Sequence, residues 1–144
     1  MKSKYSPVLK IKEQKVSDIE IKLFNARASK SSLENSLSEL KNSAKNQEFP
    51  KSGNWADVQL VMAVNESRKT EIEMIKEKIA FTNNQIYQLE NAYKEAFKDK
   101  EKMKYLHETE VTNTLKKLAH KSQKELDELA VSGYFRRHNN ENNI

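Results

Sequence analysis

Asn46-Gln47-Glu48-Phe49-Pro50-Lys51-Ser52-Gly53-Asn54-Trp55 is the stretch that decides how this chain folds. It holds one of the two prolines and one of the two glycines in the 144 residues. Pro50 cannot continue a helix and favours an extended conformation at the residue before it. Gly53 can adopt φ > 0, and Ser52 or Asn54 can cap a helix that follows. The stretch therefore predicts a turn between two helices.

Composition favours an elongated coiled coil over a globular core. Charged residues make up 33% of the chain, hydrophobic residues 36%, and the mean hydropathy is −0.91. This is too polar for a well-filled core and too rich in helix formers for disorder. The predicted fold is all-α: one domain over residues 1–144, a long two-helix antiparallel coiled-coil hairpin whose second helix is the longer. We expect helix one at about 6–47, the turn at 48–54, helix two at about 55–132 and a flexible tail at 133–144.

The chain has no cysteine, which excludes a disulfide framework and a thiolate metal site. No apolar run approaches the roughly 18 residues that a membrane span needs, and residues 1–10 lack a hydrophobic signal core. We therefore expect a cytoplasmic protein. The net charge of +5 resides in residues 1–30, which carry eight Lys or Arg against three acids. Nucleic acid, anionic lipid or an acidic protein surface could each bind such an end.

Apolar residues follow the three-four spacing of a coiled-coil seam in the first half of the chain. Ser6-Pro7 is a helix-start signal. Nine of the eleven seam positions are apolar, and the two lysines interrupt them. The seam is Leu9, Lys12, Val16, Ile19, Leu23, Ala26, Lys30, Leu33, Leu37, Leu40 and Ala44.

The second half has a weaker seam, because it includes Asn65, Arg68 and Thr82. Polar seam residues cost stability but can fix the register. The seam is Val58, Val61, Asn65, Arg68, Ile72, Ile75, Ile79, Thr82, Ile86, Leu89 and Tyr93. We expect it to change phase near Ala96 and Phe97, within a charged run at 94–104.

A distal stripe then resumes, with Val111, Leu115, Leu118, Ser122, Leu126 and Leu129. A fold axis at Pro50 pairs residues whose numbers add to about 101, so the second helix has a partner for little more than half its length. The overhang, about residues 97–132, would leave its apolar side in water, which soluble monomers avoid. Either self-association or a cognate partner should cover it.

A second surface is expected at the tip of the hairpin, where Phe49, Trp55, Val58, Val61 and Met62 cluster. Trp55 could pack across the turn. However, a hairpin end is too narrow to bury all of these side chains, and exposed aromatics with Met are typical of protein contact surfaces. We therefore expect a partner to bind there.

No catalytic site is evident, and we expect no enzyme activity and no cofactor. The three histidines are far apart, without the spacing of a metal site. There is no glycine-rich loop for a phosphate, and the carboxylate pairs sit on exposed helix without a pocket, so we expect no small-molecule substrate. The charged run has acids between its lysines and few aromatics, so nucleic-acid binding has little support.

Two segments resemble the FliJ family of flagellar type III export proteins. Lys121-Ser122-Gln123-Lys124-Glu125-Leu126-Asp127-Glu128-Leu129-Ala130, followed by Tyr134-Phe135-Arg136-Arg137, resembles the closing element of that family. Asn54-Trp55-Ala56-Asp57-Val58-Gln59-Leu60-Val61-Met62 is similar to the aromatic-led segment that opens its second helix. Length and helix layout agree over nearly the whole chain. The end departs from the family pattern, with Gly133 and an Asn-rich stretch in place of a purely basic tail.

The resemblance implies a non-enzymatic protein similar to the central stalk of rotary ATP synthases. Its partners would be the hexameric export ATPase, a membrane export-gate protein and export chaperones, at the inner face of the cell membrane at the flagellar base. The end with both termini would meet the ATPase, with Lys10, Leu115, Leu118, Ser122, Leu126 and Leu129 as contacts. The tip would meet the gate. The alternatives are a self-associating structural coiled coil without an ATPase partner, and a basic-helix binder of nucleic acid or anionic membrane through Lys2, Lys4, Lys10 and Lys12.

Overall fold

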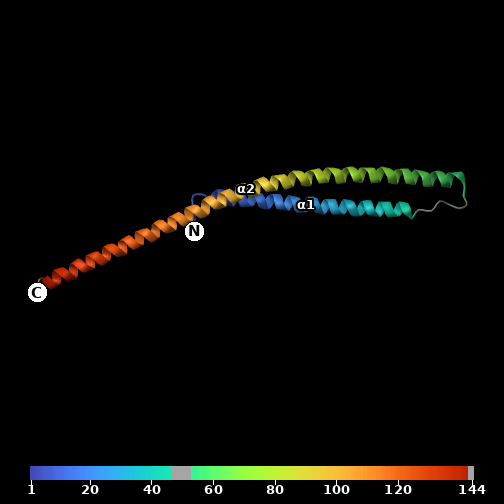
Figure 1. Cartoon of the computed structure of the whole chain (residues 1–144). Coiled ribbons are helices and arrows are strands. Elements are labelled where there is room, and N and C mark those ends of the chain that lie inside the picture. Colours follow the sequence, from blue (N-terminus) through green and yellow to red (C-terminus); the bar gives the residue numbers. More distant parts are fainter. Residues whose placement is uncertain (47–52, 143–144) are drawn as a thin grey trace. The chain divides into compact units, whose positions relative to one another are not determined.

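The computed structural model describes residues 1–46 and 53–142. Within these ranges the chain forms two helices and no strand: α1 (Ser6–Lys45) and α2 (Trp55–Asn142) (Figure 1). The all-α fold with a longer second helix is therefore confirmed. Most of the predicted turn, including Phe49 and Pro50, lies outside the described residues. No helix in the described ranges is long and apolar enough to cross a membrane.

The sequence predicted a single domain, and the chain divides into two compact units. Unit 1 combines Met1–Glu13 with Lys98–Ile144, and unit 2 is Gln14–Phe97. Both helices contribute to both units.

In unit 2, α1 and α2 run side by side in opposite directions (Figure 1). A small core forms where one face of each helix meets the other. Its buried residues are Val16, Ile19, Leu23 and Ala96, and Ile86, Leu89 and Tyr93 pack against them. Polar contacts also cross between the helices: Arg68 donates to the Ser43 carbonyl (3.4 Å) and the Tyr93 hydroxyl to Glu20 (3.4 Å).

The predicted seam residues are the ones that the structure buries. On α1, ten of the eleven are buried or half-buried, and only Ala44, next to the helix end, is exposed. On α2, all eleven are buried or half-buried. Thr82 is a buried polar residue, and its hydroxyl donates to the Lys78 carbonyl one turn earlier (2.8 Å), so its burial leaves no unpaired donor.

The predicted register, in contrast, is wrong by about three helical turns. The residue numbers add to 111 for Arg68 and Ser43 and to 113 for Tyr93 and Glu20, whereas we predicted about 101. A shift of about ten to twelve residues is close to three turns, so the same faces still meet. The nine residues between Lys45 and Trp55 can span about 30 Å and therefore do not fix the register.

In unit 1, residues 1–13 pack antiparallel to α2. Lys12 Nζ lies 4.0 Å from Asp99 Oδ2, and Ser3 Oγ lies 2.7 Å from His107 Nδ1. α1 begins at Ser6 as expected, but Ser3 supplies the cap. Ser3 Oγ accepts from the Tyr5 N–H (3.1 Å), and Ser6 Oγ accepts from the Ser3 N–H (2.8 Å). This reciprocal pair has the form of a capping box, with a serine in place of the usual Glu.

The expected change of phase near Ala96 does not occur. Ala96 is itself buried, and the half-buried positions continue at the same spacing through Lys100, Met103, His107 and Glu110. Three of these four side chains are polar or charged, which is why a search for apolar periodicity does not reveal them. Consequently the unpartnered stretch of α2 begins near residue 112, about fifteen residues later than we expected.

α2 begins at Trp55 as predicted, with Asn54 before it, but its other end differs from the prediction. Gly53 has no positive φ; a Cβ there would lie 2.8 Å from Asp57 Oδ2, so glycine gives space for a close approach. Asp57 in turn accepts from the Asn54 N–H (3.3 Å), as an acid at the third helical position does in a capping box. At the other end, the helix does not stop near residue 132 but continues through Gly133 to Asn142.

Candidate partner-binding surfaces

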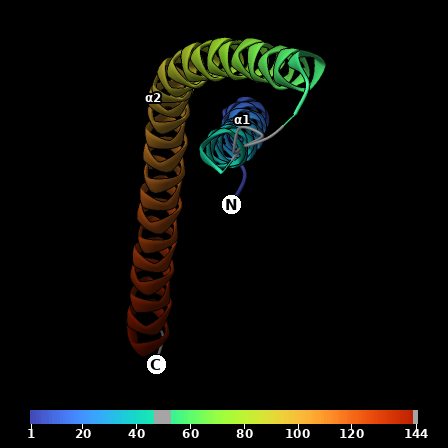
Figure 2. The ribbon, with the colours of Figure 1, turned by 90° about the vertical axis from the view of Figure 1, so that its right-hand side faces the viewer.

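The first candidate surface is the distal leucine face of unit 1, which we define as Leu115, Leu118, Ser122, Leu126 and Leu129. The four leucines are 50–69% exposed, and every residue from 112 to 132 is exposed. α2 continues here beyond the start of α1, so residues 1–13 do not lie beside it (Figure 2). The predicted distal stripe is thus on one helix and, beyond the half-buried Val111, uncovered within the unit.

Lys10 does not form a compact site with this face. The Lys12–Asp99 and Ser3–His107 contacts place Lys10 level with α2 residues near 102. Leu115 is about thirteen residues further along, or about 20 Å of helix. Lys10 is exposed and available to a partner, but one that touches both positions would have to extend along the helix.

Sequence reasoning missed a second group of exposed apolar residues further along α2, on the side of the helix away from the distal leucine face. Val131, Tyr134 and Phe135 are 54–66% exposed and lie on the same helix. A shallow groove beside them has a volume of about 560 Å³; its lining is Lys124, Asp127, Glu128, Val131, Ser132 and Phe135. The Tyr134 ring stacks on His138 with centroids 6.1 Å apart. The adjacent aromatics were a usable signal, but we had expected the helix to end before them.

The structure separates the predicted tip residues into two groups. Trp55 and Met62 are 71% and 54% exposed, whereas Val58 and Val61 are half-buried on the seam side of α2. Phe49 lies outside the described residues. Leu60, at 65% exposure, belongs with the outward group. The available tip surface is therefore narrower than the predicted cluster.

Unit 2 has further exposed apolar side chains on α1 that sequence reasoning did not single out. Ile21 and Phe24 are 57% and 73% exposed. They flank the buried Leu23 in sequence but point away from the seam, because neighbouring helical residues are about 100° apart. In the sequence, only their position off the seam indicated that they are exposed. Single exposed apolar residues are common on protein surfaces, so this position did not single them out.

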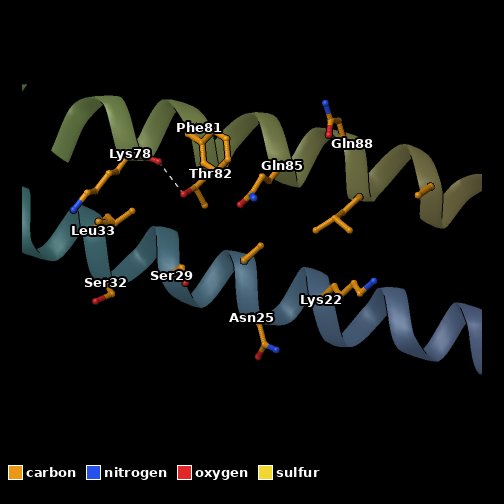
Figure 3. A pocket seen from close by; sticks show the side chains of 13 residues that line it. Lys22, Asn25, Ser29, Ser32, Leu33, Lys78, Phe81, Thr82, Gln85 and Gln88 are labelled. Atoms are coloured by element: carbon orange, nitrogen blue, oxygen red, sulfur yellow. Dashed lines mark hydrogen bonds between the residues drawn. The ribbon is translucent and has the colours of Figure 1, made fainter. Parts of the chain in front are cut away.

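A groove between the helices of unit 2 has a volume of about 950 Å³. Figure 3 shows Leu33 and Thr82 between the helices, while Asn25 and Gln88 point away from the opposite helix. The labelled lining is mainly hydroxyl and amide groups, without converging charges for a cofactor. In the described part of the chain, no group of three or more His, Cys, Asp or Glu is placed to hold a metal ion.

These features define a class: an antiparallel two-helix protein that offers exposed apolar helix faces to partners. The chain belongs to the FliJ family, because the family model described as Flagellar FliJ protein matches residues 1–139. No match to the chain was found among curated proteins or among solved structures. Family membership makes the chain a flagellar export-related component, in a family that is not catalytic.

Proposed function

We propose that this chain is a stalk and adaptor of the flagellar export apparatus. In this role it binds the hexameric export ATPase, promotes assembly of the ATPase ring, and links the ring to the membrane export gate and to export chaperones. It works on the cytoplasmic side, peripherally associated with the membrane at the flagellar base. Family membership supports the setting, and the distal leucine face supports the ATPase contact.

The distal leucine face is the observation that carries the proposal. Four leucines half or more exposed on one side of a helix are unusual for a protein that has no partner. They contribute little to the fold of unit 1, because no other element of the unit covers them. A partner gains from burying them roughly 1.5–3 kcal/mol per leucine before the costs of association.

The charge near this face suits a partner with acidic patches. Lys116, Lys117 and Lys121 precede the acidic residues of the segment, and Lys10 adds a positive charge further along the unit. Charged residues at the rim of an apolar contact mainly set the orientation and the association rate. We therefore assign the affinity to the leucines and the orientation to the lysines.

The double variant Leu118→Asp/Leu126→Asp tests the ATPase contact. It should weaken binding to the purified cognate export ATPase at least about tenfold, because two carboxylates would be buried in an apolar contact. Binding is measured by interferometry, and stimulation of ATP hydrolysis in parallel. His120→Asp, on the opposite side of the same helix, is the matched control and should bind normally. If the wild-type chain neither binds nor stimulates the ATPase, the proposal is wrong.

The outward tip residues are assigned to the export gate. Trp55→Ala should weaken binding to the cytoplasmic part of the gate protein and leave ATPase binding unchanged, because Trp55 is in unit 2 and 71% exposed. Tyr87→Ala is a suitable control, since Tyr87 is an aromatic of α2 in the same unit with 64% exposure. The reverse pattern, with ATPase binding lost, would mean that the two ends have been assigned the wrong way round.

A further inference from the structure

The distal leucine face is symmetric about Ser122. Leu115-Lys116-Lys117-Leu118 and Leu126-Asp127-Glu128-Leu129 have the same apolar spacing and lie at equal distances from Ser122, on either side of it. Their charges are opposite: two lysines in the first block and two acids in the second. Read from either end, the segment therefore has the same leucine spacing, but the charged residues between the leucines have the opposite sign.

Helical geometry places the whole set on one side. At about 100° per residue, the four leucines and Ser122 fall within a sector about 80° wide, with Ser122 at its middle. All five residues are exposed and belong to one continuous helix. The symmetry in the sequence is thus also a symmetry of the helix surface.

We propose that a second copy of this chain binds this face antiparallel, with the two Ser122 residues opposite each other. Leu115 of one copy then meets Leu129 of the other, and Leu118 meets Leu126. The small Ser122 side chain lets the helices approach closely at the two-fold axis. Such an isologous contact closes on itself and gives a dimer.

Charge complementarity along one flank supports the antiparallel orientation. One flank of the face carries Lys117 and Lys121 in its first half and Glu125 and Glu128 in its second half. In the antiparallel pair, the two lysines of one copy lie along the two glutamates of the other, and the two-fold axis repeats the arrangement. A parallel pair would lack these contacts, because its two-fold axis places this flank beside the opposite flank of the partner helix.

The contact is expected to be weak and reversible. The segment from Leu115 to Leu129 is about 22 Å long, so the pair buries less surface than a standard protein interface. The dimer does not depend on the proposed ATPase contact. Because both complexes use the same leucines, they exclude each other, so the dimer is a resting form in which the ATPase-binding face is covered.

Sedimentation equilibrium of the full chain alone tests the pairing, from low micromolar to several hundred micromolar protein. The mass should rise with concentration from 16.8 kDa towards that of a dimer. Lys117→Glu/Lys121→Glu and Glu125→Lys/Glu128→Lys should each weaken self-association at least about tenfold. An equimolar mixture of these two variants should restore the dimer, because it recreates every opposite-charge pair. The chain with all four substitutions should dimerise again by itself.

A cysteine cross-link reports the orientation while leaving the native charges in place. The chain has no cysteine, so Ser122→Cys introduces a single thiol on the two-fold axis. It should form a disulfide-linked dimer on mild oxidation. Leu115→Cys should not, because its two copies would be about 21 Å apart along the antiparallel pair, whereas a parallel pair would bring them together.

Three outcomes would overturn the inference. A monomer mass at every concentration together with no Ser122→Cys cross-link excludes the dimer. Cross-linking of both single-cysteine variants shows a parallel pair. Failure of the mixture and of the fourfold variant to recover the dimer, with helicity unchanged by circular dichroism, shows that the charges do not pair as assigned. None of these measurements involves the ATPase, so the proposed function stands or fails separately.

Discussion

The paired helices of unit 2 and the distal segment of α2 in unit 1 have the same kind of sequence but opposite environments. Both carry leucines at helical spacing on one side. Leu23 in unit 2 is 6% exposed, whereas Leu126 in the distal segment is 60% exposed. The difference is a neighbouring helix. Periodicity therefore predicts which side of a helix is apolar, but it does not say whether the same chain covers that side.

The apolar residues therefore fall into two groups: those that stabilise the fold and those that are available to another molecule. The seam of unit 2 supports the fold, and only a few of its residues are buried rather than half-buried, so each should matter for stability. The distal leucines support nothing within their own unit and are free for another molecule. Matched substitutions in the two regions should therefore differ in their effect on stability.

Replacing a leucine should show the largest difference in stability between the two regions. Leu23→Ala removes a buried side chain and should lower the free energy of unfolding by about 2–4 kcal/mol. Leu126→Ala removes an exposed one and should change it by less than about 0.5 kcal/mol in the monomer. Urea denaturation followed by circular dichroism at low protein concentration measures both.

A control for the loss of side-chain volume lies next to Leu23. Phe24→Ala removes a larger side chain, but Phe24 is 73% exposed and should be close to neutral. Equal losses for Leu23→Ala and Leu126→Ala would mean that the distal face is part of the folded core, and the contrast between the regions would be lost.

Replacing glycine with alanine should change local helix stability in the two regions to an extent that differs by about 1 kcal/mol. Gly133 lies inside the unpaired helix with nothing within 4 Å of an added Cβ, so Gly133→Ala should stabilise the helix locally by about 1 kcal/mol. Hydrogen exchange of the surrounding amides should slow about fivefold.

Gly53→Ala is the matched change in unit 2, and it should have the opposite sign. Its Cβ would lie 2.8 Å from Asp57 Oδ2 and displace the side chain that accepts from the Asn54 N–H. Exchange in the first turn of α2 should therefore become faster. Slower exchange in both variants would show that Asp57 moves aside without cost.

The sequence allowed the seams to be predicted almost residue by residue, because apolar spacing records which side of each helix faces its partner. It did not allow the register to be predicted. A three-four pattern repeats along the helix, so sliding by three turns, from Leu23 opposite Ile79 to Leu23 opposite Leu89, leaves apolar side against apolar side. Only the detailed fit of particular side chains selects one register.

The candidate surfaces were predicted in part, for a similar reason. The distal leucines stood out by their spacing. The seam residues between Ala96 and Val111 did not, because Lys100, His107 and Glu110 occupy seam positions with polar atoms. Sequence also placed the end of α2 too early, since Gly133 is a common stop signal but is tolerated within a helix that no partner constrains.

Replacing Thr82 measures how much a polar seam residue lowers the free energy of unfolding of the paired region. Its hydroxyl bonds only to the Lys78 carbonyl of its own helix, so Thr82→Val leaves no buried group unpaired and adds an apolar methyl to the seam. The variant should gain about 0.5 kcal/mol in the free energy of unfolding. Thr112→Val, at an exposed position of the distal segment, should be neutral in the same urea titration. A loss of stability for Thr82→Val would show that the hydroxyl has a structural role beyond this bond.

The smallest effect is expected for the ion pair between the helices of unit 2. Arg27 Nη2 and Glu90 Oε1 are 3.3 Å apart, but the side chains are 59% and 46% exposed. An exposed pair in water contributes little, so Glu90→Gln should cost less than about 0.5 kcal/mol, and the difference should vanish at high salt. Urea titrations at low and high salt measure this against Asp127→Asn, whose carboxylate accepts only from Gln123 within the distal segment (3.0 Å). A loss above about 1 kcal/mol for Glu90→Gln would mean that charge, together with the apolar seam, holds the two helices of unit 2 in register.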